Sequence, residues 1–227
     1  MNDIKRESGW EIEDAPDPVF GASLIKEIYE AADPGADHRP AVPLLVNVKT
    51  RTLASTESPA ILRYIATGFA GREHVRIDLC PDDLREEINA LNRWLHDHIN
   101  RAVYTVGFAR EQSDYENQAF ALFRDLDTLN ERLSGSTFLF GDRLTESDLF
   151  LYGTLRRFDI VYGPLFRCSL KRVADYGGLS RFVANIAEQP GMSESFNRAR
   201  TKIHYFKSLI HSPAGTLDPN PSGVVPI

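Results

Sequence analysis

The sequence has 227 residues, of which 42% are hydrophobic and 26% are charged. These proportions are ordinary for a globular protein, and the length allows one large domain or a small domain followed by a medium one. The formal net charge of −6 makes the chain a poor binder of phosphate backbones through bulk charge. The composition therefore argues against a nucleic-acid partner.

Cysteine content and hydropathy bear on location. The sequence holds two cysteines, Cys80 and Cys168, and no Cys-x-x-Cys, which is too few thiols for a disulfide framework. The beginning of the sequence has no apolar run typical of a signal peptide. No stretch approaches the roughly 20 apolar residues that a membrane span needs. We therefore expect a cytoplasmic protein without a membrane partner.

The first part of the sequence combines polar, helical and extended patterns. Residues 1–18 are polar and contain prolines, and we interpret them as an irregular lead. Residues 20–32 carry apolar side chains at helical spacing, and Asp33-Pro34-Gly35 ends that helix. The apolar positions are Leu24, Ile25, Ile28 and Tyr29.

Two short strands and a helix are expected next. The apolar run Val42–Val46 predicts a buried strand, and Thr52–Ala54 predicts a second strand after a turn. Ser58 is a preferred N-cap residue and Pro59 suits the first helical position, so a helix is expected to begin here. The segment from Gly68 to Asp78 has the character of a linker.

Beyond the linker, the apolar periodicity predicts helices. Residues 83–102 and 112–133 carry apolar residues every three or four positions, and residues 179–188 predict a further helix ended by Gln189-Pro190-Gly191. From Ser212 onward prolines and glycines predict an extended tail. In the segment 112–133 the apolar face consists of Ala119, Leu122, Phe123, Leu126, Leu129 and Leu133.

A capping pattern marks the start of another helix. Thr145 can accept a hydrogen bond from the backbone N–H of Asp148, and Asp148 can accept one from Thr145, a variant of the capping box. Leu144 can pack on Leu149 as a hydrophobic staple. The apolar run Leu149–Leu155 predicts that this helix is buried on most sides.

The predicted fold is therefore α+β and mostly α. A small α/β piece covers residues 1–68, and a helical domain with an extended tail covers residues 78–227. A sheet of two strands is marginal by itself, so the small piece needs further strands or a covering helix.

One candidate binding site follows from these elements. The strand edge at Val42-Pro43 offers free backbone groups, and the helix that opens at Glu57-Ser58 offers free N–H groups and a positive dipole end. Together they suit a peptide-like ligand that ends in a carboxylate. An ordinary strand beside an ordinary capped helix explains the same residues without a ligand.

Cysteines and histidines give weaker signals. Cys80 is followed by two acidic residues, which raise the pKa of a thiol, and Cys168 has one neighbouring arginine; we expect both to be inert. His96 and His98 lie two residues apart on a predicted helix and face different directions, so no metal site is predicted.

Tyr104 and Tyr205 can each donate a hydrogen bond to a quinone or hydroquinone oxygen and stack on its ring. For each tyrosine taken alone, the pattern favours a core or surface residue whose hydroxyl is satisfied.

Several strings resemble one protein family. Val-Pro before a turn and Glu-Ser at a helix start resemble the glutathione-binding half of a transferase, and Leu-Thr-Glu-Ser-Asp resembles the buried helix start of its C-terminal domain. More specific strings resemble the glutathionyl-hydroquinone reductases, the Xi-class glutathione transferases, across nearly the whole chain. These are Asp17-Pro18 with Gly21-Ala22, Ala32-Asp33-Pro34, Ala102-Val103-Tyr104 with Gly107-Phe108-Ala109, Thr154–Asp159 with Val161-Tyr162, Phe166-Arg167-Cys168, Gln189-Pro190-Gly191 and Ile203-His204-Tyr205.

The resemblance implies a fold and a set of roles. It implies a partial thioredoxin-like N-terminal piece joined to an all-helical glutathione transferase C-terminal domain, and a homodimer. Val42, beside a cis Pro43, would pair its backbone with glutathione, and Glu57 and Ser58 would hold the γ-glutamyl end. Lys26 falls where the family has an arginine near the glycine carboxylate of glutathione. The lysine replaces the planar guanidinium of arginine with the point charge of an ammonium group.

The family reaction is implied in the same way. Tyr104 and Tyr205 match the tyrosines of the hydroquinone pocket. The implied activity removes glutathione from a glutathionyl-hydroquinone, which gives free hydroquinone and glutathione disulfide. Glutathione is the co-substrate and no metal is implied.

The sequence departs from the family at the catalytic position. The family thiolate belongs to a Cys-Pro-Trp motif, and no such motif occurs here. The resemblance begins at Gly9-Trp10, which predicts an N-terminally truncated member. Cys80-Pro81 lies in the linker and is not expected to substitute. Two hypotheses remain: an enzyme related to the reductases, or a non-catalytic glutathione-binding or protein-interaction module on the same scaffold.

Overall fold

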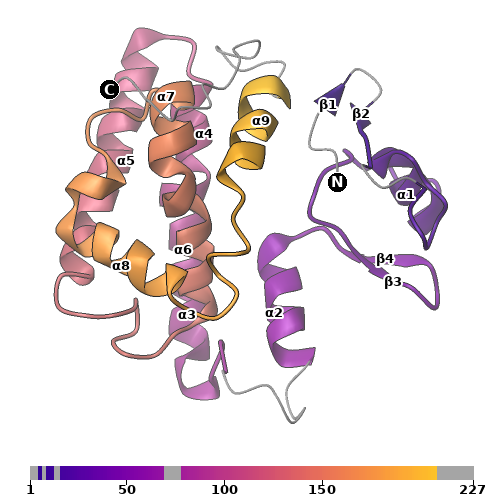
Figure 1. Cartoon of the computed structure of the whole chain (residues 1–227), viewed down its shortest axis with the longest axis horizontal. Coiled ribbons are helices and arrows are strands. Elements are labelled where there is room, and N and C mark those ends of the chain that lie inside the picture. The colour runs from indigo at the N-terminus through magenta and orange to yellow at the C-terminus, as the bar shows by residue number, and fades with distance from the viewer. Residues whose placement is uncertain (1–4, 7–8, 13–15, 69–77, 209–227) are drawn as a thin grey trace.

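The computed structural model describes residues 5–6, 9–12, 16–68 and 78–208. Helices dominate the described part of the chain (Figure 1). The expected tail from Ser212 and most of the linker lie outside the described residues. No helix within the described ranges is long and apolar enough to cross a membrane.

The described residues of the N-terminal part form two small antiparallel sheets and two helices. Strands β1 and β2 form one pair and β3 and β4 form the other, while α1 and α2 lie beside them (Figure 1). The elements are β1 (Lys5–Arg6), β2 (Gly9–Trp10), α1 (Ile25–Ala32), β3 (Leu45–Asn47), β4 (Thr52–Ser55) and α2 (Ser58–Gly68). The interpretation of residues 1–18 as entirely irregular is therefore wrong, because β1 and β2 pair within that lead.

Two of these elements begin later than expected. Helix α1 begins at Ile25 because the preceding segment forms a turn with Gly21 at φ 71°, and the Glu27 carboxylate accepts hydrogen bonds from the N–H groups of Ser23 and Leu24 at 2.8 and 3.0 Å. Strand β3 begins at Leu45, after Pro43, whose nitrogen has no hydrogen to donate. The Val42–Pro43 peptide is cis, as the resemblance implied.

The start of α2 differs from the expectation by one residue. The Glu57 carbonyl accepts from the Ile61 N–H at 2.9 Å, so Glu57 holds the cap position and Ser58 begins the helix. Ser55 Oγ accepts from the Glu57 N–H at 3.1 Å. Proline is tolerated through the first helical turn, so the position of Pro59 could not distinguish these two registers.

The helical part follows the predicted apolar pattern closely. The expected segment 112–133 forms α5, and all six residues of its predicted apolar face are buried. The segment 83–102 is not one helix, because a π-helical turn over His96–Asn100 separates α3 from α4. The helices are α3 (Arg85–Leu95), α4 (Ala102–Gly107), α5 (Gln112–Arg132), α6 (Glu146–Arg157), α7 (Gly163–Phe166), α8 (Gly177–Ala187) and α9 (Arg198–Ser208).

The π-helical turn has a packing consequence. Its Arg101 N–H reaches back five residues to the His96 carbonyl at 2.8 Å, which inserts one residue into the helical repeat. With that extra residue, Ile99, Val103 and Val106 all become fully buried. Close packing continues at Gly107, where the Phe166 ring occupies the space that a Cβ atom would need.

Two clusters of buried apolar side chains stabilise the described chain. The larger joins α3 to α9, and the smaller joins α1 to the strands β3 and β4. Helix α9 lies between the two parts in Figure 1. There His204 of α9 stacks on Trp10 of β2, with ring centroids 5.2 Å apart.

The start of α6 is an unusually polar stretch of the core. Thr145, Glu146, Ser147 and Asp148 are each at most 1% exposed. The Asp148 carboxylate accepts from the Thr145 N–H, the Thr145 hydroxyl and the Leu139 N–H, all at 2.8 Å. The predicted capping box is therefore confirmed, and Asp148 additionally caps the loop before the helix.

We predict that Asp148→Ala lowers the free energy of unfolding by about 1–3 kcal/mol, because it leaves three buried donors without their acceptor. Urea unfolding measures the change. Asp175→Ala is the matched control, since Asp175 accepts from the Arg172 N–H at 3.1 Å in the same cap arrangement but at the surface. Equal midpoints for parent and Asp148→Ala would contradict the role assigned to burial.

Candidate functional site

Described residues of the N-terminal part and of the helical part line two cavities together. We call the first the arginine–tyrosine pocket; it has a volume of about 320 Å³ and brings Val42 opposite residues of α6 and α9. Its lining consists of Val42, Arg156, Arg157, Ser195, Phe196, Asn197, Arg200, Thr201, His204 and Tyr205. The family resemblance linked Val42 to glutathione and Tyr205 to the hydroquinone pocket. In the structure both residues line the same cavity.

Behind Tyr205 lies a cluster of three tyrosine hydroxyls. The Tyr205 hydroxyl is 2.9 Å from the Tyr104 hydroxyl and 3.0 Å from the Tyr162 hydroxyl. Three hydroxyls carry three hydrogens, and two are used in the two mutual hydrogen bonds. One hydrogen is left that the cluster can donate to a ligand oxygen.

Burial changes the pKa of two of these three hydroxyls, those of Tyr104 and Tyr162. It raises the pKa of Tyr104 and of Tyr162 well above the ordinary value of 10.0, and the neighbouring Tyr205 adds to both shifts. The positive charge of Arg157 partly opposes the shift at Tyr104. Tyr104 and Tyr162 are thus neutral donors at physiological pH and cannot act as phenolate bases there.

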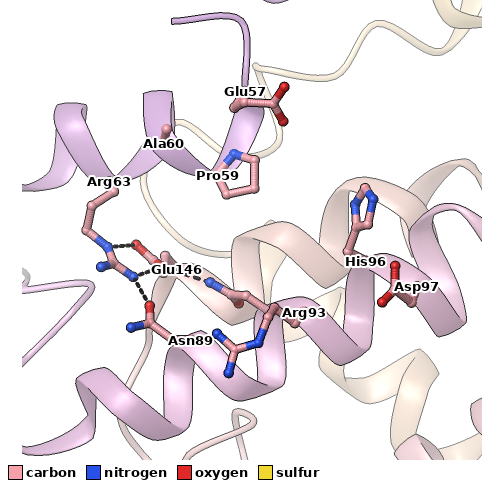
Figure 2. A pocket seen from close by; sticks show the side chains of 10 residues that line it. Glu57, Pro59, Ala60, Arg63, Asn89, Arg93, His96, Asp97 and Glu146 are labelled. Atoms are coloured by element: carbon pink, nitrogen blue, oxygen red, sulfur yellow. Dashed lines mark hydrogen bonds and ion pairs between the residues drawn. The ribbon is translucent and has the colours of Figure 1, made fainter.

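We call the second space the α2 cavity, and Figure 2 shows its wall. It has a volume of about 460 Å³ and separates α2 from α3 and from the start of α6. Arg63 of α2 donates through Nε to Glu146 Oε2 at 2.7 Å and through Nη2 to Asn89 Oδ1 at 3.0 Å. Asn92 Nδ2 donates to Glu146 Oε1 at 2.8 Å. Glu57 lies at the opposite rim in Figure 2.

The buried Glu146 carboxylate therefore joins the two parts of the chain. Its partner Arg63 is about one quarter exposed while the Glu146 side chain is 2% exposed. The hydrogen bonds with Glu146 raise the pKa of the Arg63 guanidinium above its usual value. This ion pair holds α2 against the helical part.

Comparisons with known proteins identify the relatives of this architecture. Residues 112–185 match the glutathione S-transferase C-terminal domain family. The chain is 36% identical over 231 residues to glutathionyl-hydroquinone reductase PcpF of Sphingobium chlorophenolicum, covering 100% of this chain and 72% of that protein. It is 34% identical over 232 residues to glutathionyl-hydroquinone reductase YqjG of Escherichia coli, covering 100% and 69%.

The chain belongs to the glutathionyl-hydroquinone reductase family, the Xi-class glutathione transferases. The glutathione-bound structure of YqjG from Escherichia coli K-12 superposes with a TM-score of 0.87 at 33% identity, covering 100% of this chain and 73% of that chain. Glutathione S-transferase Xi from Phanerochaete chrysosporium superposes with a TM-score of 0.86 at 33% identity, covering 100% and 78%. The predicted fold class, a partial thioredoxin-like piece with a helical transferase C-terminal domain, is confirmed.

The other predicted contact residues of this Xi-class chain are more dispersed. Glu57 lines the α2 cavity, while Ser58 and Lys26 are exposed and line neither of the two cavities described above. Tyr104 lies behind Tyr205 and touches it through the hydroxyl. Tyr162 was not selected from the sequence, although the string Val161-Tyr162 belongs to the family resemblance; only its bond to Tyr205 reveals it.

Both cysteines of the chain are buried. Burial raises the pKa of the Cys80 thiol and raises that of Cys168 to about 12. Neither cysteine lines the two cavities. Both thiols are packed, as expected, and their low reactivity stays a prediction.

The histidines of the α3–α4 segment have individual partners. His98 bonds to Asp125 at 2.8 Å and stacks on Trp94, while His96 packs against Phe150. Across the described ranges, no three His, Cys, Asp or Glu side chains are grouped as a metal site requires.

We predict that neither thiol of the folded chain reacts rapidly with 5,5′-dithiobis(2-nitrobenzoic acid) at pH 8. The reason is that a thiol with a raised pKa is almost fully protonated there, and burial also blocks the reagent. Denaturation in urea should release both thiols, which provides the control for complete reaction. Rapid reaction of one equivalent in the folded state would contradict the burial of that cysteine.

Proposed function

We propose that this chain binds glutathione in the space between its N-terminal and helical parts, with a hydroquinone-type aromatic molecule in the arginine–tyrosine pocket. The observation that supports this most directly is the cavity shared by Val42 and Tyr205. The relatives add support, because PcpF and YqjG are named glutathionyl-hydroquinone reductases and YqjG is described with glutathione bound.

Within this proposal each residue has a distinct task. The backbone of Val42 pairs with the cysteine part of glutathione, and Glu57 with the start of α2 at Ser58 receives the γ-glutamyl end. Lys26 supplies a point charge for the glycine carboxylate. The tyrosine cluster donates its remaining hydrogen to an oxygen of the aromatic ligand.

The domain division belongs to the same proposal. Residues 1–68 act as the glutathione-binding domain and residues 78–227 as the helical domain that supplies the aromatic pocket. We further propose a homodimer. The separate apolar clusters of the two parts support the division, since each part has buried contacts of its own.

A second candidate is a binding module without reductase activity. It is favoured by the state of the two cysteines, which are both buried, carry raised pKa values and line neither cavity. The family reaction needs a thiolate that attacks the substrate sulfur. An S–S bond then forms as the carbon–sulfur bond breaks, and the ring carbon gains a proton. Neither Cys80 nor Cys168 is placed for that attack.

We expect glutathione binding to weaken about tenfold in Ser58→Ala, because a hydrogen bond to a carboxylate is worth about 1.5–3 kcal/mol. Isothermal titration calorimetry on the 227-residue chain provides the measurement. Ser113→Ala is the matched control, since Ser113 is an exposed serine in the first turn of α5. Equal affinities for the parent and Ser58→Ala would remove Ser58 from the site.

We predict no glutathione-dependent turnover of a glutathionyl-hydroquinone by the 227-residue chain, because neither of its thiols is an accessible thiolate. Detection of released hydroquinone by chromatography tests this, with PcpF as the positive control. Turnover that disappears in Cys80→Ser and persists in Cys168→Ser would contradict the prediction and assign the reaction to Cys80.

A further inference from the structure

We propose that the arginine–tyrosine pocket selects an aromatic ligand that carries an acidic substituent, such as a carboxylate, in addition to its ring hydroxyls. Arg156 and Arg157 are the residues assigned to this recognition. The proposal rests on the proposed function above and specifies the substrate class of the same pocket.

Arg156 is held on the pocket wall by neutral groups. Its guanidinium carbon lies 4.6 Å from the Phe196 ring centroid and 5.2 Å from that of Tyr152. Its Nη1 donates to Ser195 Oγ at 3.1 Å. Its Nε is buried without a hydrogen-bond partner among the described residues. The guanidinium is therefore oriented by uncharged partners.

Arg157 adds a second positive charge beside the first. Its Nη1 donates to the Gly153 carbonyl, which is also neutral. Within the part of the chain that the structure describes, neither arginine forms an ion pair with a carboxylate. Burial and the Arg157 charge both lower the pKa of Arg156, as expected for neighbouring cations without a counter-ion.

The acid nearest to these arginines in sequence is otherwise engaged. The Asp159 carboxylate accepts from the N–H groups of Val173 and Ala174 at 2.7 and 3.1 Å, which caps the turn before α8. The chain as a whole has a net charge of −6, so the positive pocket is a local feature. Two neighbouring cations repel each other, and the attraction of an anionic ligand to both offsets this repulsion.

The neighbouring groups suggest how one ligand satisfies the pocket. A guanidinium presents paired donors that match the two oxygens of a carboxylate. Tyr205 lines the same cavity, so the aromatic part of a ligand can pack beside it, and its hydroxyl leads to the tyrosine cluster. A dihydroxybenzoate combines these three features in a molecule small enough for about 320 Å³.

Calorimetric titration of the full chain with 2,5-dihydroxybenzoate and 2,5-dihydroxybenzamide tests the proposal. The two ligands share ring, hydroxyls and size and differ in charge. We expect the acid to bind about tenfold more tightly than the amide, which corresponds to about 1.4 kcal/mol. Arg156→Gln and Arg157→Gln should each reduce this ratio.

Further variants separate charge from structure. Arg156→Lys and Arg157→Lys keep the positive charge and should retain most of the preference for the acid. Arg124→Gln is a control for overall charge, because Arg124 lies exposed on α5 away from the pocket. Equal affinities for acid and amide in the parent, or a preference that survives both Gln variants, overturn the proposal.

Titration in saturating glutathione distinguishes the two sources of a carboxylate. If glutathione abolishes the preference and both Gln variants lose glutathione affinity, the arginines hold a glutathione carboxylate and the proposal is wrong. A parent that prefers the acid but does not bind glutathione supports the pocket assignment while contradicting the proposed glutathione site. The two failures are therefore distinguishable.

Discussion

The buried polar start of α6 is the constraint on which the arrangement of this chain depends. Four consecutive polar residues, 145–148, lie in the interior, where each must find hydrogen-bond partners. Asp148 satisfies the backbone N–H groups of Leu139 and Thr145, while Glu146 reaches outward to Arg63 of α2. The same turn thus caps a core helix and attaches the N-terminal part.

Helix α6 also fixes the distance between the two cavities. Glu146 at its first residue faces the α2 cavity, and Arg156 and Arg157 at its end face the arginine–tyrosine pocket. The helix advances roughly 1.5 Å per residue, so these ends are roughly 16 Å apart along the axis.

The three tyrosines of the cluster belong to the core of the helical part and come from three different elements. Tyr104 comes from α4, Tyr205 from α9 and Tyr162 from the π-helical turn Phe158–Tyr162 that follows α6. Their rings pack edge to face, with Tyr162 centroids 5.7 Å from Tyr104 and 5.6 Å from Tyr205. The apolar packing that stabilises these helices also holds the hydroxyls within hydrogen-bond distance.

The sequence by itself determined the features that depend on local order. The apolar periodicity of α5, the Thr145–Asp148 cap and the family strings are all properties of neighbouring residues, so the helical fold and the family could be predicted. The boundaries of α1, β3 and α2 and the π-helical turn at His96–Asn100 could not, because side-chain hydrogen bonds and core packing shift them by a few residues.

Only the tertiary structure decided which distant residues meet. Arg63 and Glu146 are 83 positions apart, and Tyr104 and Tyr205 are 101 positions apart. No periodicity encodes such pairs, because they arise from how helices pack rather than from spacing along one helix. For the same reason the sequence suggested Val42 and Tyr205 separately, and only the fold placed them in one cavity beside Arg156 and Arg157, for which the described residues provide no carboxylate partner.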